Sequence, residues 1–135
     1  MPELTWAEIE RHARTLAPVE AYGADWQGLA FPAGVRVRIQ PLTIGGHAYL
    51  GAVTGGCPAR RMSLASVIAW NSRLPPGCTV VLEGGCLWLR FLVPKARVTL
   101  AYVEELLTFM VREGGQLAPD MPAQIGTDVF EGFAD

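Results

Sequence analysis

Three segments of the chain carry the same helix-start signal, a hydroxyl residue at the N-cap with an apolar residue on either side of the first turn. The N-caps are Thr5, Ser63 and Thr99. In such a start the hydroxyl accepts a hydrogen bond from a free N–H of the first turn, and the two apolar residues pack together as a hydrophobic staple. The staple pairs are Leu4 with Ile9, Met62 with Val67, and Val98 with Val103. Because each cap contributes about 1 kcal/mol, the chain is expected to fold around three helices that begin at these points.

The first helix has the most complete signal, because Thr5 and Glu8 form a T-x-x-E capping box. Apolar residues then recur at steps of three and four in all three segments, which is typical of helices with one buried side. Each helix is expected to end before residues that do not continue it: Pro18, the pair Pro75-Pro76, and the pair Gly114-Gly115.

Between the helices the apolar period changes from 3.6 to 2, which indicates strands. Val35, Val37 and Ile39 alternate with polar residues, as in a half-buried strand. The glycine pairs 45–46 and 84–85 predict two tight hairpin turns. The expected strands span residues 25–31, 35–40, 47–54, 78–83 and 86–93.

The resulting order, α-βββ-α-ββ-α, predicts an α+β fold in which helices pack on one face of an antiparallel sheet. A chain of 135 residues fits one domain. We expect that domain to cover residues 1–116. Residues 117–135 contain two Pro, two Gly and scattered apolar residues, so we interpret them as a loosely held C-terminal extension.

Charge and cysteine content narrow the class of protein. Eleven basic residues against thirteen acidic ones argue against direct nucleic-acid binding. The three cysteines, Cys57, Cys78 and Cys86, have neither zinc nor disulfide spacing, which favours free thiols in a reducing compartment. The N-terminus is charged and helix-like, and no apolar run reaches the roughly 18 residues of a membrane span. We therefore expect a cytoplasmic protein.

No catalytic pattern is present in the sequence. The two histidines, His12 and His47, have no carboxylate or cysteine at ligand spacing. No nucleophile motif such as G-x-S-x-G occurs. We therefore expect no catalytic residue, no metal site and no cofactor, and conclude that the chain is not an enzyme.

The glycine-rich segment 54–61 is the best candidate for an anion site, because it leads into a helix N-terminus. Its candidate ligands are Gly55, Gly56, Arg60 and Arg61. It lacks the G-x-x-x-x-G-K-[ST] pattern, and Pro58 removes one N–H donor. A flexible connection between strand and helix is the favoured interpretation.

Two features of the sequence are unusual for an isolated domain: a polar residue on an apolar helix stripe, and a strand that is apolar on both faces. Asn71 falls on the apolar stripe of the second helix, where its amide needs hydrogen bonds; neighbouring backbone is the favoured partner, and a second copy is the alternative. The strand 86–93 is apolar on both faces, so Trp88 and Leu92 are expected to be exposed or covered by a partner.

The element order and several short motifs resemble the YbjN family, whose fold is that of type III secretion chaperones. The motifs are Ala69-Trp70-Asn71, Pro75-Pro76-Gly77, Leu87-Trp88-Leu89-Arg90, Val93-Pro94 with Thr99, and Tyr102-Val103-Glu104-Glu105-Leu106-Leu107. The resemblance covers roughly residues 4–115. It implies a bacterial, non-enzymatic protein, usually a homodimer, that binds a partner protein through apolar patches. A net charge of −2 is mild for a secretion chaperone, which favours the broader YbjN-like group.

From this resemblance we assign two surfaces. The dimer or partner interface is expected at Val67, Trp70, Asn71, Leu74 and Trp88. The client-binding surface, which an extended segment of the partner would wrap, is expected at Trp6, Ile9, Trp26, Leu29 and Phe31.

Two alternatives from other classes stay open. One is a small-molecule or nucleotide binder that uses the loop 54–61. The other is an accessory protein in nucleic-acid transactions such as DNA repair. In the second case the DNA contacts would be Arg36, Arg38, Arg60 and Arg61. The protein partner of the favoured function could itself bind nucleic acid.

Overall fold

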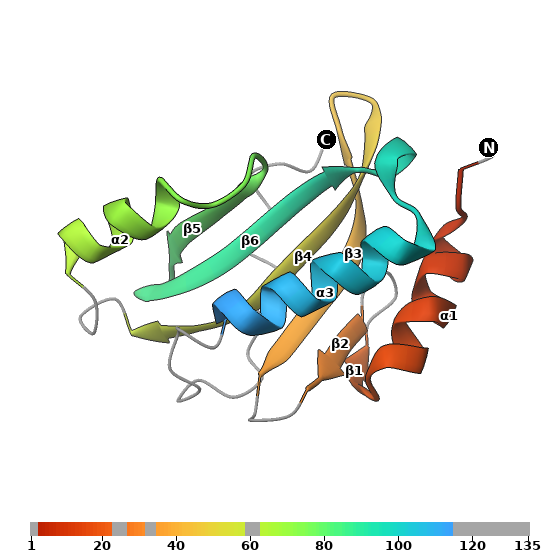
Figure 1. Cartoon of the computed structure of the whole chain (residues 1–135), viewed down its shortest axis with the longest axis horizontal. Coiled ribbons are helices and arrows are strands. Elements are labelled where there is room, and N and C mark those ends of the chain that lie inside the picture. Colours follow the sequence, from red (N-terminus) through yellow and green to blue (C-terminus); the bar gives the residue numbers. More distant parts are fainter. Residues whose placement is uncertain (1–2, 23–26, 32–34, 59–62, 115–135) are drawn as a thin grey trace.

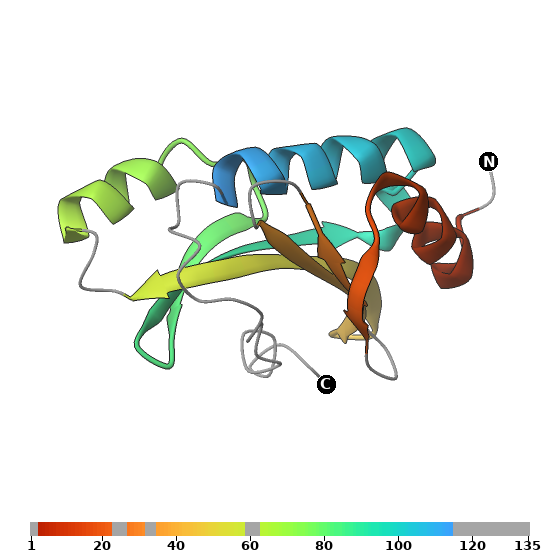
Figure 2. The ribbon, with the colours of Figure 1, turned by 90° about the horizontal axis from the view of Figure 1, so that it is seen from below.

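The computed structural model describes residues 3–22, 27–31, 35–58 and 63–114. Within these residues three α-helices lie on one side of a six-stranded antiparallel sheet (Figure 1). Figure 2 shows the two layers edge-on, with the helices together above the sheet. The expected α+β fold with helices on one face is confirmed.

The sheet has the strand order β1-β2-β3-β4-β6-β5, and every neighbouring pair is antiparallel. The strands are β1 (Val19–Tyr22), β2 (Gln27–Ala30), β3 (Arg36–Ile44), β4 (His47–Pro58), β5 (Cys78–Glu83) and β6 (Cys86–Pro94). The two expected hairpin turns join β3 to β4 and β5 to β6. Their glycine pairs, 45–46 and 84–85, all have positive φ, the conformation that matches the twist of the flanking strands.

The sheet differs from the expectation at three places, one of which is that β3 continues past the expected residue 40 to Ile44. β1 was not predicted, because its four residues carry no alternating pattern and the strand exists only through pairing with β2. β4 continues past Thr54 to Pro58, with an irregularity in its pairing with β6 between Thr54 and Cys57. The prediction that residues 54–58 are a flexible connection is therefore wrong, because their backbone pairs with β6.

The first helix, α1 (Trp6–Leu16), begins as predicted. The Glu8 N–H donates to Thr5 Oγ1 at 3.2 Å, and the Thr5 N–H donates to Glu8 Oε1 at 3.1 Å. Both halves of the capping box are present, so two N–H groups that the helix itself cannot satisfy are bonded.

The other two helices, α2 (Leu64–Asn71) and α3 (Leu100–Gly114), also begin at the predicted caps. The Ser66 N–H donates to Ser63 Oγ, and the Tyr102 N–H donates to Thr99 Oγ1, both at 3.1 Å. α2 is shorter than expected, because the chain turns at residues 72–74 before the proline pair is reached.

The main core lies between the helices and the sheet. α3 runs across β3, β4 and β6, and α1 packs beside it. Phe91 of β6 and Phe109 of α3 meet edge to face, with 5.6 Å between ring centroids. Gly114 lets the last turn of α3 approach β4, because a Cβ at this position would lie 2.7 Å from Thr54 Cγ2. A second, smaller apolar cluster on the opposite face of the sheet consists of Leu42, Val53, Cys86 and Trp88.

Candidate protein-binding surface

Two residues of the expected client-binding surface belong to the core. Ile9 and Leu29 have no exposed surface and lie in the main cluster between helices and sheet. The expectation that their side chains face a partner is wrong, because the buried side of α1 turns toward β2 and the rest of the sheet. Trp6 and Phe31 are partly buried and pack against the same cluster. Trp26 lies outside the described residues.

Both tryptophans of the expected dimer or partner interface are buried. Trp70 lies in the main core and donates its Nε1–H to Glu113 Oε2 at 2.9 Å. Trp88 lies in the smaller cluster and donates its Nε1–H to the Glu83 carbonyl at 3.0 Å. The expectation of exposed tryptophan anchors is therefore wrong. Each indole contacts its own chain and has its polar atom bonded there.

The remaining interface residues lie at the inner side of α2 and in the turn after it. Val67 and Leu74 are partly buried against the main core. The Asn71 Oδ1 accepts the Val80 N–H at 2.7 Å. This confirms the interpretation of Asn71 as a link to neighbouring backbone.

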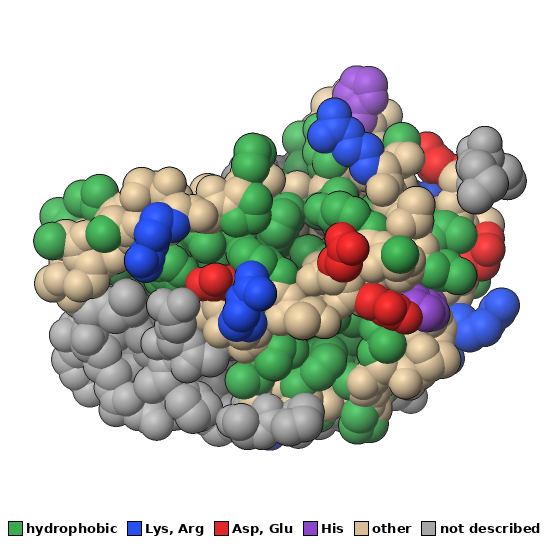
Figure 3. Space-filling model, in the orientation of Figure 1, with side chains coloured by type: hydrophobic (Ala, Val, Ile, Leu, Met, Phe, Trp, Pro, Cys, Tyr) green, Lys and Arg blue, Asp and Glu red, His purple; other side chains and the backbone are tan. Residues whose placement is uncertain are grey.

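The exposed apolar side chains are different residues of the same region. Leu64 and Ile68 of α2 are 75 % and 60 % exposed, and Leu82 of β5 is 64 % exposed. Leu64 and Ile68 are four residues apart, so they lie next to each other on the helix surface. Figure 3 shows hydrophobic side chains gathered over α2. Sequence reasoning missed this pair, although a helix that is apolar on several sides was a readable signal.

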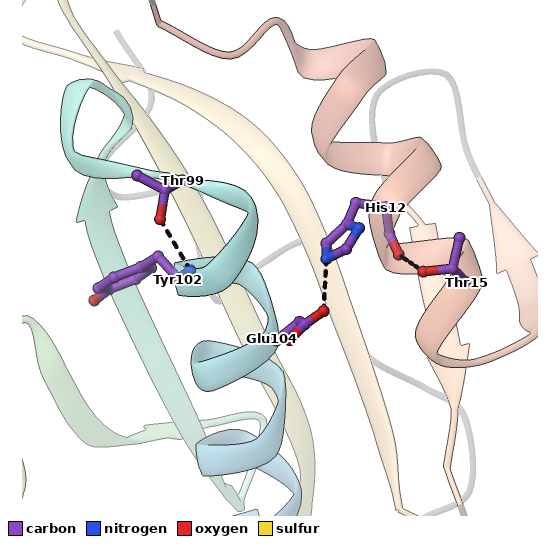
Figure 4. A network of polar contacts seen from close by, with 5 residues as sticks. All are labelled: His12, Thr15, Thr99, Tyr102 and Glu104. Atoms are coloured by element: carbon purple, nitrogen blue, oxygen red, sulfur yellow. Dashed lines mark hydrogen bonds and ion pairs between the residues drawn. The ribbon is translucent and has the colours of Figure 1, made fainter. Parts of the chain in front are cut away.

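A second exposed region lies where α1 meets α3. The His12 Nε2 lies 3.0 Å from Glu104 Oε1, across the two helices (Figure 4). Beside this contact is a shallow cavity of about 190 Å³. The cavity is lined by Glu8, Arg11, His12, Thr15 and Leu100. Leu16 and Leu100 add exposed apolar surface to these two helices.

The described side chains do not form a metal site or an activated nucleophile. One histidine beside one carboxylate is too few for a metal, and the described residues contain no group of three or more His, Cys, Asp or Glu side chains. Burial, with a further contribution from Glu113, raises the pKa of the Cys78 thiol to about 12. Cys78 is therefore protonated at neutral pH and a poor nucleophile.

Arg36 of the DNA alternative is partly exposed, and the other placed residues do not favour either alternative function. Gly55 and Gly56 belong to strand β4 rather than to a loop, and Arg60 and Arg61 lie outside the described residues. Arg38 is 1 % exposed, so its guanidinium is not on a surface that DNA could reach. None of the helices in the described ranges is both long enough and apolar enough to span a bilayer.

Comparison with known proteins rests on the fold alone. No protein-family model matches the sequence, and no curated protein sequence matches it. Among solved structures, a chain of the HopA1–SchA chaperone–effector complex is similar with a TM-score of 0.63 and 10 % identity, over 81 % of this chain and 88 % of that one.

Two further solved structures show the same likeness. One is the Yersinia pestis type III secretion chaperone SycH in complex with a stable fragment of YscM2, with a TM-score of 0.59 and 16 % identity, over 82 % of this chain and 96 % of that one. The other is the ExsC–ExsE complex, with a TM-score of 0.60 and 14 % identity, over 85 % and 90 %. The chain thus has a fold like that of type III secretion chaperones.

Proposed function

We propose that this chain is a non-enzymatic, chaperone-like module that binds an extended segment of a partner protein and works as a homodimer. The observation that carries the proposal is the fold shared with chains that were solved together with a bound protein: the HopA1–SchA complex, SycH with its YscM2 fragment, and ExsC–ExsE.

The outer face of α2 is the surface we assign to the dimer. Leu64 and Ile68 project from it side by side and are mostly exposed. Two large aliphatic side chains on an eight-residue helix leave apolar area in water, and pairing with a second copy would remove that area. This assignment replaces Trp70, which faces the core, by its exposed neighbours on α2, and it leaves out Trp88, which is buried on the other face of the sheet.

The client-binding surface is assigned to the other end of the molecule, at α1, its contact with α3, and the outer strand β1. An extended segment can pair with an edge strand while alternate side chains enter apolar hollows. Trp6 and Phe31 are the residues of the original assignment that keep partial exposure there. Leu16 and Leu100 extend the apolar surface.

The partner we propose belongs to the diverse group that the YbjN resemblance implies, and not to exported effectors alone. The net charge of −2 and the sequence resemblance to YbjN proteins favour this reading. A cytoplasmic location stays a prediction.

Light scattering of the purified chain tests the dimer. We expect a solution mass near twice 14.6 kDa, and a monomer for Ile68→Lys, because a charge would have to be buried at the interface. Ala69→Lys, at an exposed position of the same helix that points about 100° away from Ile68, is the matched control and should stay a dimer. If Ile68→Lys remains a dimer, α2 is not the dimer surface.

Capture from the native cell followed by mass spectrometry tests the partner. Wild type should retain a defined protein, and Leu100→Asp should lose it while it keeps its fold and solution mass. If wild type retains no protein above the background of an unrelated domain, the chaperone-like function is wrong.

A further inference from the structure

Strand β5 ends the sheet, and its outer side is an edge that another strand could extend. Its sequence favours such pairing, because Thr79, Val80 and Val81 have high β-propensity and the strand holds no Pro or Gly and one charge. Leu82 is largely exposed at this edge. An unprotected strand of this kind pairs readily with an identical strand of a second copy.

The hairpin geometry shows which backbone groups of β5 point outward. In a two-residue hairpin the residues that flank the turn, here Glu83 and Cys86, form a hydrogen-bonded pair, and such pairs recur at every second residue. The Leu92 N–H, which donates to the Gly77 carbonyl at 3.0 Å, fits this alternation. The outward-facing residues of β5 are therefore Cys78, Val80 and Leu82.

Two of these three outward N–H groups already have acceptors from the segment that precedes the strand. The Cys78 N–H donates to the Pro75 carbonyl at 3.1 Å. The Val80 N–H, at the middle of the edge, donates to Asn71 Oδ1 at 2.7 Å. The side chain of Val80 is buried in the core, which holds this N–H in place. Asn71, the last residue of α2, thus occupies the position that the carbonyl of an added strand would take.

We propose that Asn71 closes the β5 edge and so prevents this chain from pairing, β5 to β5, with a second copy of itself. Asparagine suits the role because its side chain offers a neutral carbonyl oxygen, as a strand does. With the Val80 and Cys78 N–H groups occupied, each copy has only its Leu82 N–H to offer, so two β5 edges could form at most two hydrogen bonds, one donated by each copy, which is too few to hold them in register. The proposal is independent of the dimer assigned to α2, which involves other residues.

The test is Asn71→Ala, with Ser72→Ala at the next, exposed position as control. Hydrogen exchange of the Val80 amide should become about fivefold faster in the dilute protein, because one hydrogen bond is lost. At high concentration, light scattering should show species larger than those of wild type and of Ser72→Ala. Asn71→Asp, which keeps an acceptor oxygen, should behave as wild type does. An Asn71→Ala protein that keeps the wild-type mass at every concentration overturns the proposal.

A second variant shows whether the new association uses this edge. Leu82→Lys, placed in the Asn71→Ala background, puts a charge on the exposed edge and should return the mass to the wild-type value. Continued association of the double variant overturns the proposal. Should Asn71→Ala fail to fold, Asn71→Ser carries the same expectations, since its hydroxyl is one bond shorter than the amide that reaches Val80. In an Ile68→Lys background the same differences between the variants should appear, starting from a monomer instead of a dimer, which separates them from the dimer of α2.

Discussion

Helices α1 and α2 start with the same kind of cap but are held to the sheet in different ways. α1 has a complete capping box, buries Ile9 and Ala13, and contacts the first turns of α3. α2 buries Trp70 and leaves Leu64 and Ile68 in solvent. Its links to the rest of the chain include two polar ones, Trp70 to Glu113 and Asn71 to Val80. The difference teaches that a cap sets where a helix begins, whereas the packed face decides whether it belongs to the core or to a surface.

The largest expected effect comes from making the same substitution in both helices. Ile9 is fully buried and Ile68 is 60 % exposed. Ile9→Ala should lower the free energy of unfolding by about 2–5 kcal/mol, because it removes buried methyl groups and leaves a cavity. Ile68→Ala should change it by less than about 0.5 kcal/mol under conditions where the chain is monomeric. Denaturant unfolding measures both, and equal losses would contradict the division between core and surface helix.

Ile9 and Ile68 also show which features of the fold could be predicted from the sequence and which could not. Ile9 and Ile68 both follow a cap at helical spacing, and periodicity alone does not say which stripe meets the sheet. The caps, hairpin glycines and sheet type were predictable because they depend on local chemistry. β1 was missed because only its pairing with β2 defines it, and Trp88 was misplaced because both faces of β6 are apolar.

The next largest expected change in stability comes from a substitution in α3, which lies between the other two helices and covers the sheet. Gly114→Ala should lower the free energy of unfolding by about 1–3 kcal/mol, because the new Cβ would lie 2.7 Å from Thr54 Cγ2 and Oγ1. Thr108→Ala, at an exposed position of the same helix, serves as the control in thermal unfolding. A Gly114→Ala protein as stable as wild type would show that the last turn of α3 shifts freely over β4.

A smaller effect compares the two caps directly. Thr5→Ala should cost about 1–2 kcal/mol and Ser63→Ala about 0.5–1 kcal/mol, since Thr5 belongs to a reciprocal capping box on a firmly packed helix and its loss leaves the Glu8 N–H without its acceptor. Chemical denaturation of the two variants measures the costs. The reverse order would mean that α2 depends on its cap more than its loose packing indicates.

The smallest expected effect is a pH dependence of stability that comes from Glu8 in the first turn of α1. The hydrogen bond from the Thr5 backbone, followed by that from its hydroxyl, lowers the pKa of Glu8 from its ordinary 4.5. A carboxylate with a lowered pKa in the folded state adds stability above the pKa of the unfolded chain, and that stability is lost as the pH falls through the folded value. Glu8→Gln should therefore lower the melting temperature slightly at neutral pH. The difference from wild type should shrink below the ordinary pKa of 4.5.

The two glycines of the β5–β6 turn have a consequence for the order of events during folding. Because β6 is apolar on both faces, a pairing displaced by one residue would still bury apolar side chains, so hydrophobicity discriminates weakly between the two alignments. Gly84 and Gly85, with φ of 58° and 76°, select the correct alignment through the turn itself. The Trp88 indole N–H donates to the Glu83 carbonyl across that turn, and this hydrogen bond further stabilises the correct alignment. Because its alignment depends on local geometry, we expect this hairpin to form early and to present β6 to β4 and the rest of the sheet.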